Sequence, residues 1–356
     1  MLYKEDWEEA KERLKAWWKG EVLDRVVIQV YAARRGIPHT TNWDGWVLMR
    51  NRDNPEFAIA EFEKFCRETY FGGEAFPQLW INFGPGFMAT YIGAEPRFAP
   101  DTVWFETPKD WHELKELKFD PANKWWKLTR ECTELSSEAG RDKWITGTTD
   151  LGGPLDIAAS LRGTQQLLFD LVEAPENVKS LSRRITELWY DYYQELYKIT
   201  RKNGMEGTGA WMGIWSPERW YPFQCDFSAM ISPDMFKEFV VADLQQQCRY
   251  LEHSIYHWDG PGQLSHLELL LDIPELNGIQ WVPGAGQPGT ESPKWFPLYR
   301  RIQEKGKLLV LQGVPADKIE GLLKEISAKG LLITTWVQTE DEAKDLLEKA
   351  KKWTKN

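Results

Sequence analysis

The stretch His253-Ser-Ile-Tyr-His257-Trp-Asp259-Gly260 is followed at once by Pro261-Gly262. Polar and apolar residues alternate in its first half, which predicts a short buried β-strand. His257 and Asp259 are two residues apart, so their side chains point to the same face of that strand. Because glycine and proline then stop the strand, the sequence predicts an imidazole and a carboxylate side by side where a strand opens into a loop.

Seven further short apolar segments resemble this strand and alternate with amphipathic helical segments. They cover residues 25–32, 79–83, 144–150, 207–215, 276–282, 307–312 and 331–337. Strands separated by helices favour a parallel sheet buried on both faces, and eight such units most simply close into a barrel. An open doubly wound sheet is disfavoured, because no glycine-rich phosphate loop follows the first strand.

We therefore expect an α/β protein built as a single (β/α)8 TIM-barrel domain over residues 1–356, with an N-terminal helix over residues 6–19. Two insertions are expected over the carboxyl face. Residues 91–108 are interpreted as a loop or small hairpin, and residues 216–231 as a long loop rich in aromatic residues. Thr107 before Pro108 is a plausible helix cap, and Thr339-Glu-Asp-Glu342 has the spacing of a capping box.

Composition excludes several classes of protein. The chain has 356 residues and a net charge of −10, without a basic stripe, so nucleic acid is not an expected partner. No apolar run reaches the length of a membrane span, and the N-terminus lacks the apolar core of a signal peptide. Four scattered cysteines without metal-type spacing fit a reduced, cytoplasmic protein. The oligomeric state stays open, a homodimer included.

Polar and aromatic residues stand at the predicted carboxyl ends of the strands, where barrels place their chemistry. They are Arg35, Asn82, Asp150, Trp211, Trp215, Asp226, His257, Asp259, Gln280, Trp281, Gln312 and Gln338. The three aspartates beside one histidine offer general acid and base capacity. The tryptophans, from a chain with 20 of them, are candidate walls for a flat or methylated small molecule. Alternatively, Trp211 and Trp281 fill the core, and Asp150 and Asp226 belong to turns.

Four stretches resemble the uroporphyrinogen decarboxylase superfamily. They are spread over nearly the whole chain, and their order along it is similar to that in the family. They are Arg35-Gly-Ile-Pro38, Gly152-Gly-Pro-Leu-Asp-Ile-Ala158, Ile231-Ser-Pro-Asp-Met-Phe236 and His257-Trp-Asp-Gly260. The last stands where the zinc-dependent methyltransferases of this superfamily, which act on methylated corrinoids, have His-x-Cys-Gly. The resemblance implies the barrel fold and a site at its carboxyl end.

Departures from the family pattern shape the expected activity. Tyr31-Ala-Ala-Arg-Arg35 keeps only the last arginine of the decarboxylase Arg-Gln-Ala-Gly-Arg motif, and Asn82 stands where the decarboxylases have their key aspartate. Decarboxylation of a porphyrinogen is therefore not expected. The methyltransferases use one histidine and two cysteines as zinc ligands, whereas here Asp259 replaces the first cysteine. His257, Asp259 and Cys225 are then the candidate zinc ligands.

Four functions follow as hypotheses. The first is a methyltransferase that moves a methyl group between a small methylated compound and a corrinoid or thiol acceptor. The corrinoid would arrive on a partner protein, because the chain has no D-x-H-x-x-G motif. The second is a lyase or decarboxylase with Asp259 or Asp226 as acid and Arg35 as a carboxylate clamp. The others are a glycoside-acting barrel and a non-catalytic binding protein. The expected substrate-binding residues are Tyr31, Arg35, Asn82, Trp211, Trp215, Gln280, Trp281 and Gln338.

Overall fold

The computed structural model describes residues 1–106 and 108–354. Its strands are β1 (Val27–Ala33), β2 (Thr69–Gly73), β3 (Gln78–Trp80), β4 (Glu95–Ala99), β5 (Thr102–Glu106), β6 (Ile145–Thr148), β7 (Thr208–Ala210), β8 (Trp215–Ser216), β9 (Trp220–Gln224), β10 (His253–Asp259), β11 (Gly278–Val282), β12 (Leu308–Gln312) and β13 (Leu331–Thr339).

The α-helices are α1 (Trp7–Trp18), α2 (Val47–Arg50), α3 (Pro55–Glu68), α4 (Met88–Tyr91), α5 (Trp111–Lys115), α6 (Lys124–Ala139), α7 (Pro154–Arg162), α8 (Thr164–Glu173), α9 (Pro175–Lys202), α10 (Pro233–Phe239), α11 (Val241–Tyr250), α12 (Leu267–Leu271), α13 (Phe296–Glu304), α14 (Ile319–Glu325) and α15 (Glu340–Trp353). Four 3-10 helices complete the set: η1 (Asp226–Met230), η2 (Pro261–His266), η3 (Pro293–Trp295) and η4 (Ala316–Lys318).

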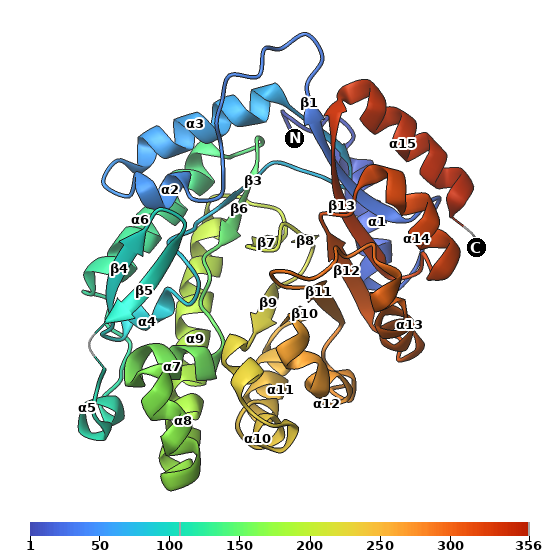
Figure 1. Ribbon diagram of the computed structural model, residues 1–356. Helices are drawn as coiled ribbons and strands as arrows, with labels where there is room; N and C mark the ends of the chain where they lie inside the picture. Colours follow the sequence, from blue (N-terminus) through green and yellow to red (C-terminus); the bar gives the residue numbers. More distant parts are fainter. Residues whose placement is uncertain (107, 355–356) are drawn as a thin grey trace.

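The strands form a mixed α/β structure with a large, mostly parallel sheet. Seven strands pair in the order β2-β1-β13-β12-β11-β10-β9, and all of these pairs are parallel except β1 with β2. A second sheet has the order β3-β6-β7-β8, in which β3, β6 and β7 are parallel. The strands of these two sheets lie near the centre of the molecule with most helices outside them, whereas the β4–β5 hairpin lies at the periphery (Figure 1). The ladders of the described residues stop at β2 and β9 on one sheet and at β3 and β8 on the other, so they form two sheets rather than one continuous ring.

The predicted strands lie close to their expected positions, but the structure adds three that the sequence did not indicate. The long loop predicted over residues 216–231 contains β9, which pairs in parallel with β10. Pro222 in its middle is tolerated because β9 is an edge strand, where a missing N–H faces away from the ladder. Thr69–Gly73 leaves α3 and pairs antiparallel with β1. The strand predicted over residues 207–215 instead reverses at Gly213, whose φ of +73° suits glycine, and Trp215–Ser216 folds back on Thr208–Gly209.

The helices were also predicted near their positions, with local corrections. Gly163, which has a φ of +87°, separates α7 from α8. The helix expected from Pro108 begins at Trp111, and Asp110 forms its capping box with Glu113. Thr107, the expected cap, lies outside the described residues. The capping box of α15 at Thr339 is confirmed, and residues 95–106 form the β4–β5 hairpin.

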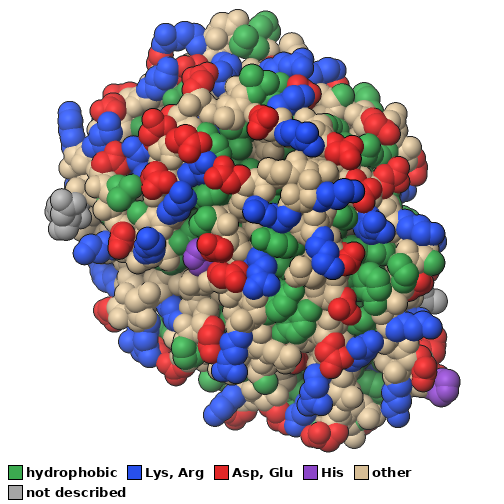
Figure 2. All heavy atoms as spheres, turned by 180° about the vertical axis from the view of Figure 1, so that it is seen from behind, with side chains coloured by type: hydrophobic (Ala, Val, Ile, Leu, Met, Phe, Trp, Pro, Cys, Tyr) green, Lys and Arg blue, Asp and Glu red, His purple; other side chains and the backbone are tan. Residues whose placement is uncertain are grey.

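The buried apolar side chains form one cluster from Tyr3 near the N-terminus to Ala350 in α15. On the space-filling face of Figure 2, lysine and arginine are interspersed with aspartate and glutamate, and no single sign covers a large area. None of the helices within the described residues is both long and apolar enough to cross a membrane.

Candidate metal centre

Three side chains converge where β9 and β10 end. His257 and Asp259 belong to β10, and Asp226 follows β9. The two strands are parallel with His257 opposite Gln224, so Asp226 and Asp259 each lie two residues beyond that pair and come to the same edge. One ligand atom from each of the three side chains lies within 4.8 Å of the others. Two carboxylates and one imidazole at this separation form a donor set suited to a divalent cation.

His257 is held on two sides. Its Nδ1 lies 2.6 Å from Oε1 of Gln280, its direct neighbour on β11. The ring of Trp211 meets the imidazole edge to face, with ring centroids 5.2 Å apart. His257 as a whole is half-buried. Of the residues predicted for this site, His257, Asp259, Asp226, Gln280 and Trp211 are therefore brought together.

The amide of Gln280 continues into a chain of hydrogen bonds across the strands. Its Nε2 donates to Oε1 of Gln312 on β12 over 2.6 Å, and Nε2 of Gln312 donates to the backbone carbonyl of Met212 over 2.9 Å. From the other side, Nε2 of Gln29 donates to the carbonyl of Gly213 over 2.7 Å, and the hydroxyl of Thr334 donates to Oε1 of Gln29 over 2.9 Å. Five adjacent strands, β10 to β13 and β1, thus carry polar side chains at one level.

Further carboxyl groups crowd the site. The carboxylate of Asp156, in the first turn of α7, accepts the backbone N–H groups of Asp226 and Phe227 over 3.1 and 2.8 Å. Burial, followed by the charge of Asp226, raises the pKa of Asp156 above its usual value. Burial also raises the pKa of Asp226, with Asp259 adding to the effect and His257 opposing it. Like-charged neighbours therefore favour the protonated forms of Asp156 and Asp226.

Asp150 serves a turn, as the alternative interpretation of the sequence proposed. Its Oδ1 accepts the N–H of Gly152 over 2.7 Å and the hydroxyl of Tyr221 over 3.3 Å. Complete burial raises the pKa of Asp150 to about 6, and the charge of Asp226 contributes. Asp150 therefore adds negative charge to the neighbourhood of the site while its carboxylate fixes the loop before α7.

A cavity of about 370 Å³ adjoins the metal candidate and includes Asp226 and Asp156 in its wall. The β4–β5 hairpin contributes Trp104 and Phe105, and η1 contributes Phe227 and Met230; the remaining lining residues are Pro85, Gly86, Val103, Pro108, Ala159, Ser160, Gly163, Thr164 and Gln224. The described lining residues include two carboxylates but no lysine, arginine or histidine. The cavity is therefore mostly apolar and carries negative charge at one side.

Three predicted residues do not join the group. Arg35 is two-thirds exposed, and its guanidinium pairs with Asp341 at the start of α15 rather than with a group of the site. Gln338 is exposed at the same helix start, where its backbone N–H donates to Glu342. Cys225 is buried and lies outside the three-residue group, because adjacent residues at the end of a strand point to opposite faces. Burial raises the pKa of the Cys225 thiol well above its usual value.

Two predicted tryptophans are core residues. Trp215 is fully buried, packs edge to face on Trp7 of α1, and donates its indole N–H to the carbonyl of Glu206 over 2.9 Å. Trp281 is fully buried between Trp258 and Trp295. Neither ring is available to a ligand, which corrects the expectation for Trp215 and agrees with the alternative interpretation of Trp281.

Asn82 and Tyr31 have defined structural partners. Asn82 is fully buried and links two loops, donating to the carbonyl of Gly45 over 2.7 Å and accepting the N–H of Gly84 over 2.8 Å. Tyr31 on β1 stacks with Trp336 on β13, with ring centroids 5.6 Å apart and planes 20° apart. Trp336 itself is 61% exposed.

The site residues predicted from the sequence did not include Trp80, Trp336 or Asp156. Trp80 precedes Asn82 by two residues and so shares its face of the chain, and its buried indole nitrogen has no partner among the described residues. Trp336 likewise follows Thr334 by two residues on β13, so these two side chains share a face of the strand. Strand periodicity could have placed both rings. Asp156 is part of the loop that carries the family resemblance, but its proximity to Asp226 depends on long-range packing.

No known protein family model matches this sequence, and no curated protein matches it.

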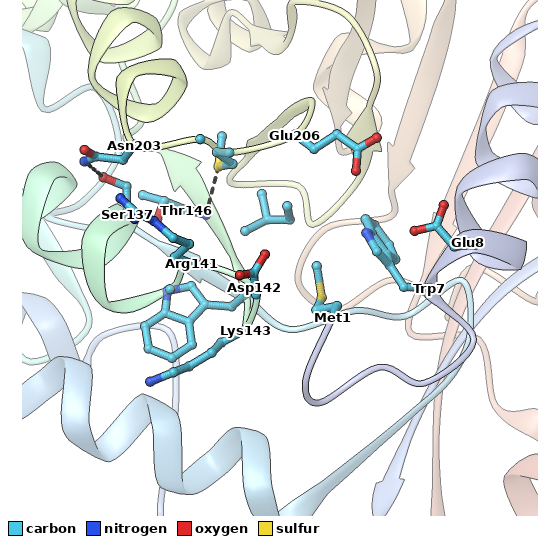
Figure 3. A pocket seen from close by; sticks show the side chains of 15 residues that line it. Met1, Trp7, Glu8, Ser137, Arg141, Asp142, Lys143, Thr146, Asn203 and Glu206 are labelled. Atoms are coloured by element: carbon cyan, nitrogen blue, oxygen red, sulfur yellow. Dashed lines mark hydrogen bonds between the residues drawn. The ribbon is translucent and has the colours of Figure 1, made fainter.

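A second cavity, of about 170 Å³, lies at the opposite end of the strands. It is bordered by the start of β6, the chain before β7, and α1, and Figure 3 shows Trp7 and Met1 on one side of it and Ser137 and Asn203 on the other. Lys143 and Glu206 in its lining are engaged in ion pairs with Glu63 and Lys11. Its lining carries acidic and basic side chains together, Asp142 with Arg141 among them, whereas the lining of the carboxyl-end cavity has acids only.

Proposed function

We propose that this chain is a divergent member of the uroporphyrinogen decarboxylase superfamily that binds a divalent metal ion and transfers a methyl group. The methyl group would move between a small methylated compound and a thiol or corrinoid acceptor. A corrinoid would be brought by a partner protein. The observation that carries the proposal is the group Asp226, His257 and Asp259, with ligand atoms within 4.8 Å of one another at the ends of parallel strands.

The donor set fits a metal ion better than it fits an isolated structural role. Among the described residues, neither the Asp226 nor the Asp259 carboxylate has an ion pair with lysine or arginine. Two such carboxylates repel each other, and a cation between them would offset that repulsion. Imidazole nitrogen and carboxylate oxygen are accepted ligands of zinc and of neighbouring first-row metals, and oxygen-rich sets reduce the selectivity for zinc.

A divalent ion bound there would lower the pKa of a coordinated thiol or water and so supply a nucleophile at neutral pH. The protein's own groups supply the rest. Trp211 and Gln280 fix the plane of the His257 ring. Asp156, with its raised pKa, holds or releases a proton next to Asp226. The aromatic walls of the adjoining cavity would exclude water from a small apolar methyl donor.

The charge of the site disfavours the decarboxylase alternative. A carboxylated substrate needs a cationic partner, and the described lining residues of the cavity include none, while Arg35 is engaged with Asp341. Glycoside hydrolysis gains no specific support. The oxygens of Asp226 and Asp259 that lie within 4.8 Å of each other also lie within 4.8 Å of a His257 nitrogen, which suits a shared metal ion better than a sugar ring placed between two carboxyl groups.

The closed eight-stranded barrel is part of this proposal. Side-chain hydrogen bonds support it where the ladders stop. The indole N–H of Trp220 on β9 donates to the carbonyl of Thr208 on β7 over 3.0 Å, and this bond links the two sheets. Gln29 of β1 reaches the carbonyl of Gly213 beyond β7 across the interior. Interior polar side chains that reach across in this way are expected when strands surround a common axis.

Methyl transfer from methylcobalamin to a panel of small thiols tests the proposal directly. The protein is stripped with a chelator and assayed with and without added Zn²⁺, Co²⁺ or Mn²⁺. We expect metal-dependent loss of the cobalt-bound methyl group and formation of the matching thioether, abolished in Asp259→Asn. The matched control is Asp345→Asn, a surface aspartate of α15 paired with Lys349. Transfer that is absent with every metal and acceptor, or that persists in Asp259→Asn, would reject the proposal.

A further inference from the structure

The hydrogen-bond chain from His257 has a fixed direction, because it ends on a backbone carbonyl. The carbonyl of Met212 only accepts, so the group of Gln312 that faces it over 2.9 Å is the amide nitrogen. The carbonyl oxygen of Gln312 then faces Gln280 over 2.6 Å and must receive a donor, which is Nε2 of Gln280. This leaves Oε1 of Gln280, an acceptor, facing His257 over 2.6 Å.

We infer that Gln280 and Gln312 are positioning residues that hold His257 as the Nδ1–H tautomer, with the lone pair of Nε2 free for a ligand. An acceptor at 2.6 Å requires a proton on Nδ1, and a neutral imidazole then carries none on Nε2. The inference rests on the proposed function for what binds Nε2, but the tautomer itself is a property of the metal-free protein.

The same turn also fixes the face of the imidazole. Trp211 immediately precedes Met212, and its ring meets His257 edge to face at 5.2 Å. The hydrogen bonds from His257 through Gln280 and Gln312 to Met212 form what we call the relay. The contact of Trp211 with His257 connects the end of this relay back to its start. Gly213, the next residue, is held independently by Gln29 over 2.7 Å. The turn between β7 and β8 is thereby anchored from two sides, which restrains both the N–H direction and the ring plane.

This arrangement matches the physical role of outer-shell partners in metal sites. A second hydrogen bond on the imidazole selects which nitrogen is free and raises its basicity, and loss of such a partner typically weakens metal binding about 10–100-fold. Because Gln312 does not contact His257, a change at Gln312 that alters the imidazole would have to act through the amide of Gln280.

Nitrogen NMR of the imidazoles in the metal-free protein at a pH where they are neutral tests the inference. The chain has five histidines, and the His257 signals are assigned by their loss in His257→Gln. In the wild type we expect a protonated, pyrrole-type Nδ1 and an unprotonated, pyridine-type Nε2 for His257. Protonation at Nε2 instead would overturn the inference, and this comparison needs no variant in the relay.

Three variants separate the relay from general packing. In Gln312→Leu, the amide of Gln280 loses the group that orients it, so the His257 signals should move toward the Nε2–H tautomer and Zn²⁺ affinity should fall about 10–100-fold. Gln280→Glu keeps an acceptor opposite Nδ1 and should retain the Nδ1–H tautomer. Gln29→Leu, which removes an interior amide bonded to the same turn, should leave the His257 signals unchanged. Equal effects of Gln312→Leu and Gln29→Leu, or no effect of Gln312→Leu, would contradict the relay.

The outcomes distinguish this inference from the proposed function. An Nδ1–H tautomer that depends on Gln312, in a protein that binds no divalent metal, keeps the relay and rejects the metal site. Metal binding by a protein whose His257 is the Nε2–H tautomer without metal keeps the metal site and rejects the relay.

Discussion

The two ends of the parallel strands treat charged groups in opposite ways. At the amino end of β1, the fully buried Glu74 receives two hydrogen bonds of 2.8 Å from Arg25 and a third, of 2.9 Å, from the N–H of Ile28. Lys4, also buried, donates to the carbonyls of Phe71 and Gly73 and pairs with Asp6. At the carboxyl end of β9 and β10, Asp226 and Asp259 face each other without a cation among the described residues.

This difference separates charges that stabilise the fold from charges that are available for chemistry. A buried carboxylate with every lone pair satisfied belongs to the folded state, and its removal leaves its partner unpaired. The pKa of Asp226, by contrast, is raised by burial and by the charge of Asp259, and the proximity of two carboxylates without a cationic partner costs stability. The amino end therefore accounts for structure, and the carboxyl end is where a ligand would compensate an existing electrostatic strain.

The largest predicted effect is at the amino end. Glu74→Gln keeps the shape of the side chain but leaves the Arg25 guanidinium buried and unpaired, so the free energy of unfolding should fall by about 3–5 kcal/mol. Urea unfolding followed by circular dichroism measures this. The control is Glu12→Gln, whose exposed pair with Lys15 is screened by solvent and should change the free energy of unfolding very little. Similar small losses for both variants would erase the distinction between the two ends.

The same type of substitution, an acid replaced by its amide, should have a different effect on the free energy of unfolding at the carboxyl end. Asp226→Asn, unfolded in the presence of a chelator, removes a charge that is repelled by Asp259 and Asp156. The free energy of unfolding should be unchanged or higher, by less than about 1 kcal/mol. A loss comparable to that of Glu74→Gln would mean that Asp226 has a structural partner and would weaken the proposed site.

The dependence of stability on pH should have opposite signs for a buried histidine at the amino end and a buried aspartate at the carboxyl end. At the amino end of β10, burial lowers the pKa of His253, which stacks on Trp18, to about 4. The unfolded state then binds more protons than the folded state between about pH 4 and 6.5, so the stability that His253 confers is lost as the pH falls through that range. His253→Phe keeps the stacking and should flatten this part of the curve of stability against pH.

Asp150 at the carboxyl end has the reverse sign. Its pKa is raised to about 6, so the folded state binds more protons than the unfolded state between about pH 4 and 6, and stability falls as the pH rises through that window. Asp150→Asn preserves the acceptor for Gly152 and should remove this decline. Chemical unfolding at a series of pH values measures both variants, and a decline unchanged in Asp150→Asn would assign it to other groups.

The smallest predicted effect is at Arg35. Arg35→Ala breaks an exposed pair with Asp341, so the free energy of unfolding should change by less than about 1 kcal/mol. Divalent metal affinity should stay the same, because the side chain is not part of the three-residue group. A large loss of substrate or metal binding in this variant would restore the carboxylate clamp that the sequence had suggested.

Local periodicity accounts for what the sequence predicted well. His257 and Asp259 share a face because a strand has a period of two, and this needs no knowledge of the rest of the fold. The predicted pairing of Cys225 with His257 failed for a related reason. Because Pro222 and the aromatic residues around it did not read as a strand, the alternation of β9 could not be applied. Gln224 and Asp226 follow one face of β9 and Cys225 the other, which gives the site an acid where a thiol was expected.

Long-range partners were beyond the sequence. Nothing near Arg35 indicates that Asp341, 306 positions later, neutralises it. The direction of the Gln280 amide likewise depends on the Met212 carbonyl of a turn in the other sheet. The eight alternating units were predicted from short apolar segments that alternate with amphipathic helical ones, whereas the additional strands β2, β8 and β9 follow from turns whose geometry depends on packing.

Calorimetric titration of Zn²⁺ into the metal-free protein tests the central claim most directly, with Asp259→Asn and His257→Gln measured beside it. We predict one ion bound per chain in the wild type. Each variant should lose more affinity than the about 10–100-fold that follows the loss of an outer partner. Wild-type protein that binds no zinc, or variants that bind it as tightly as the wild type, would contradict the account.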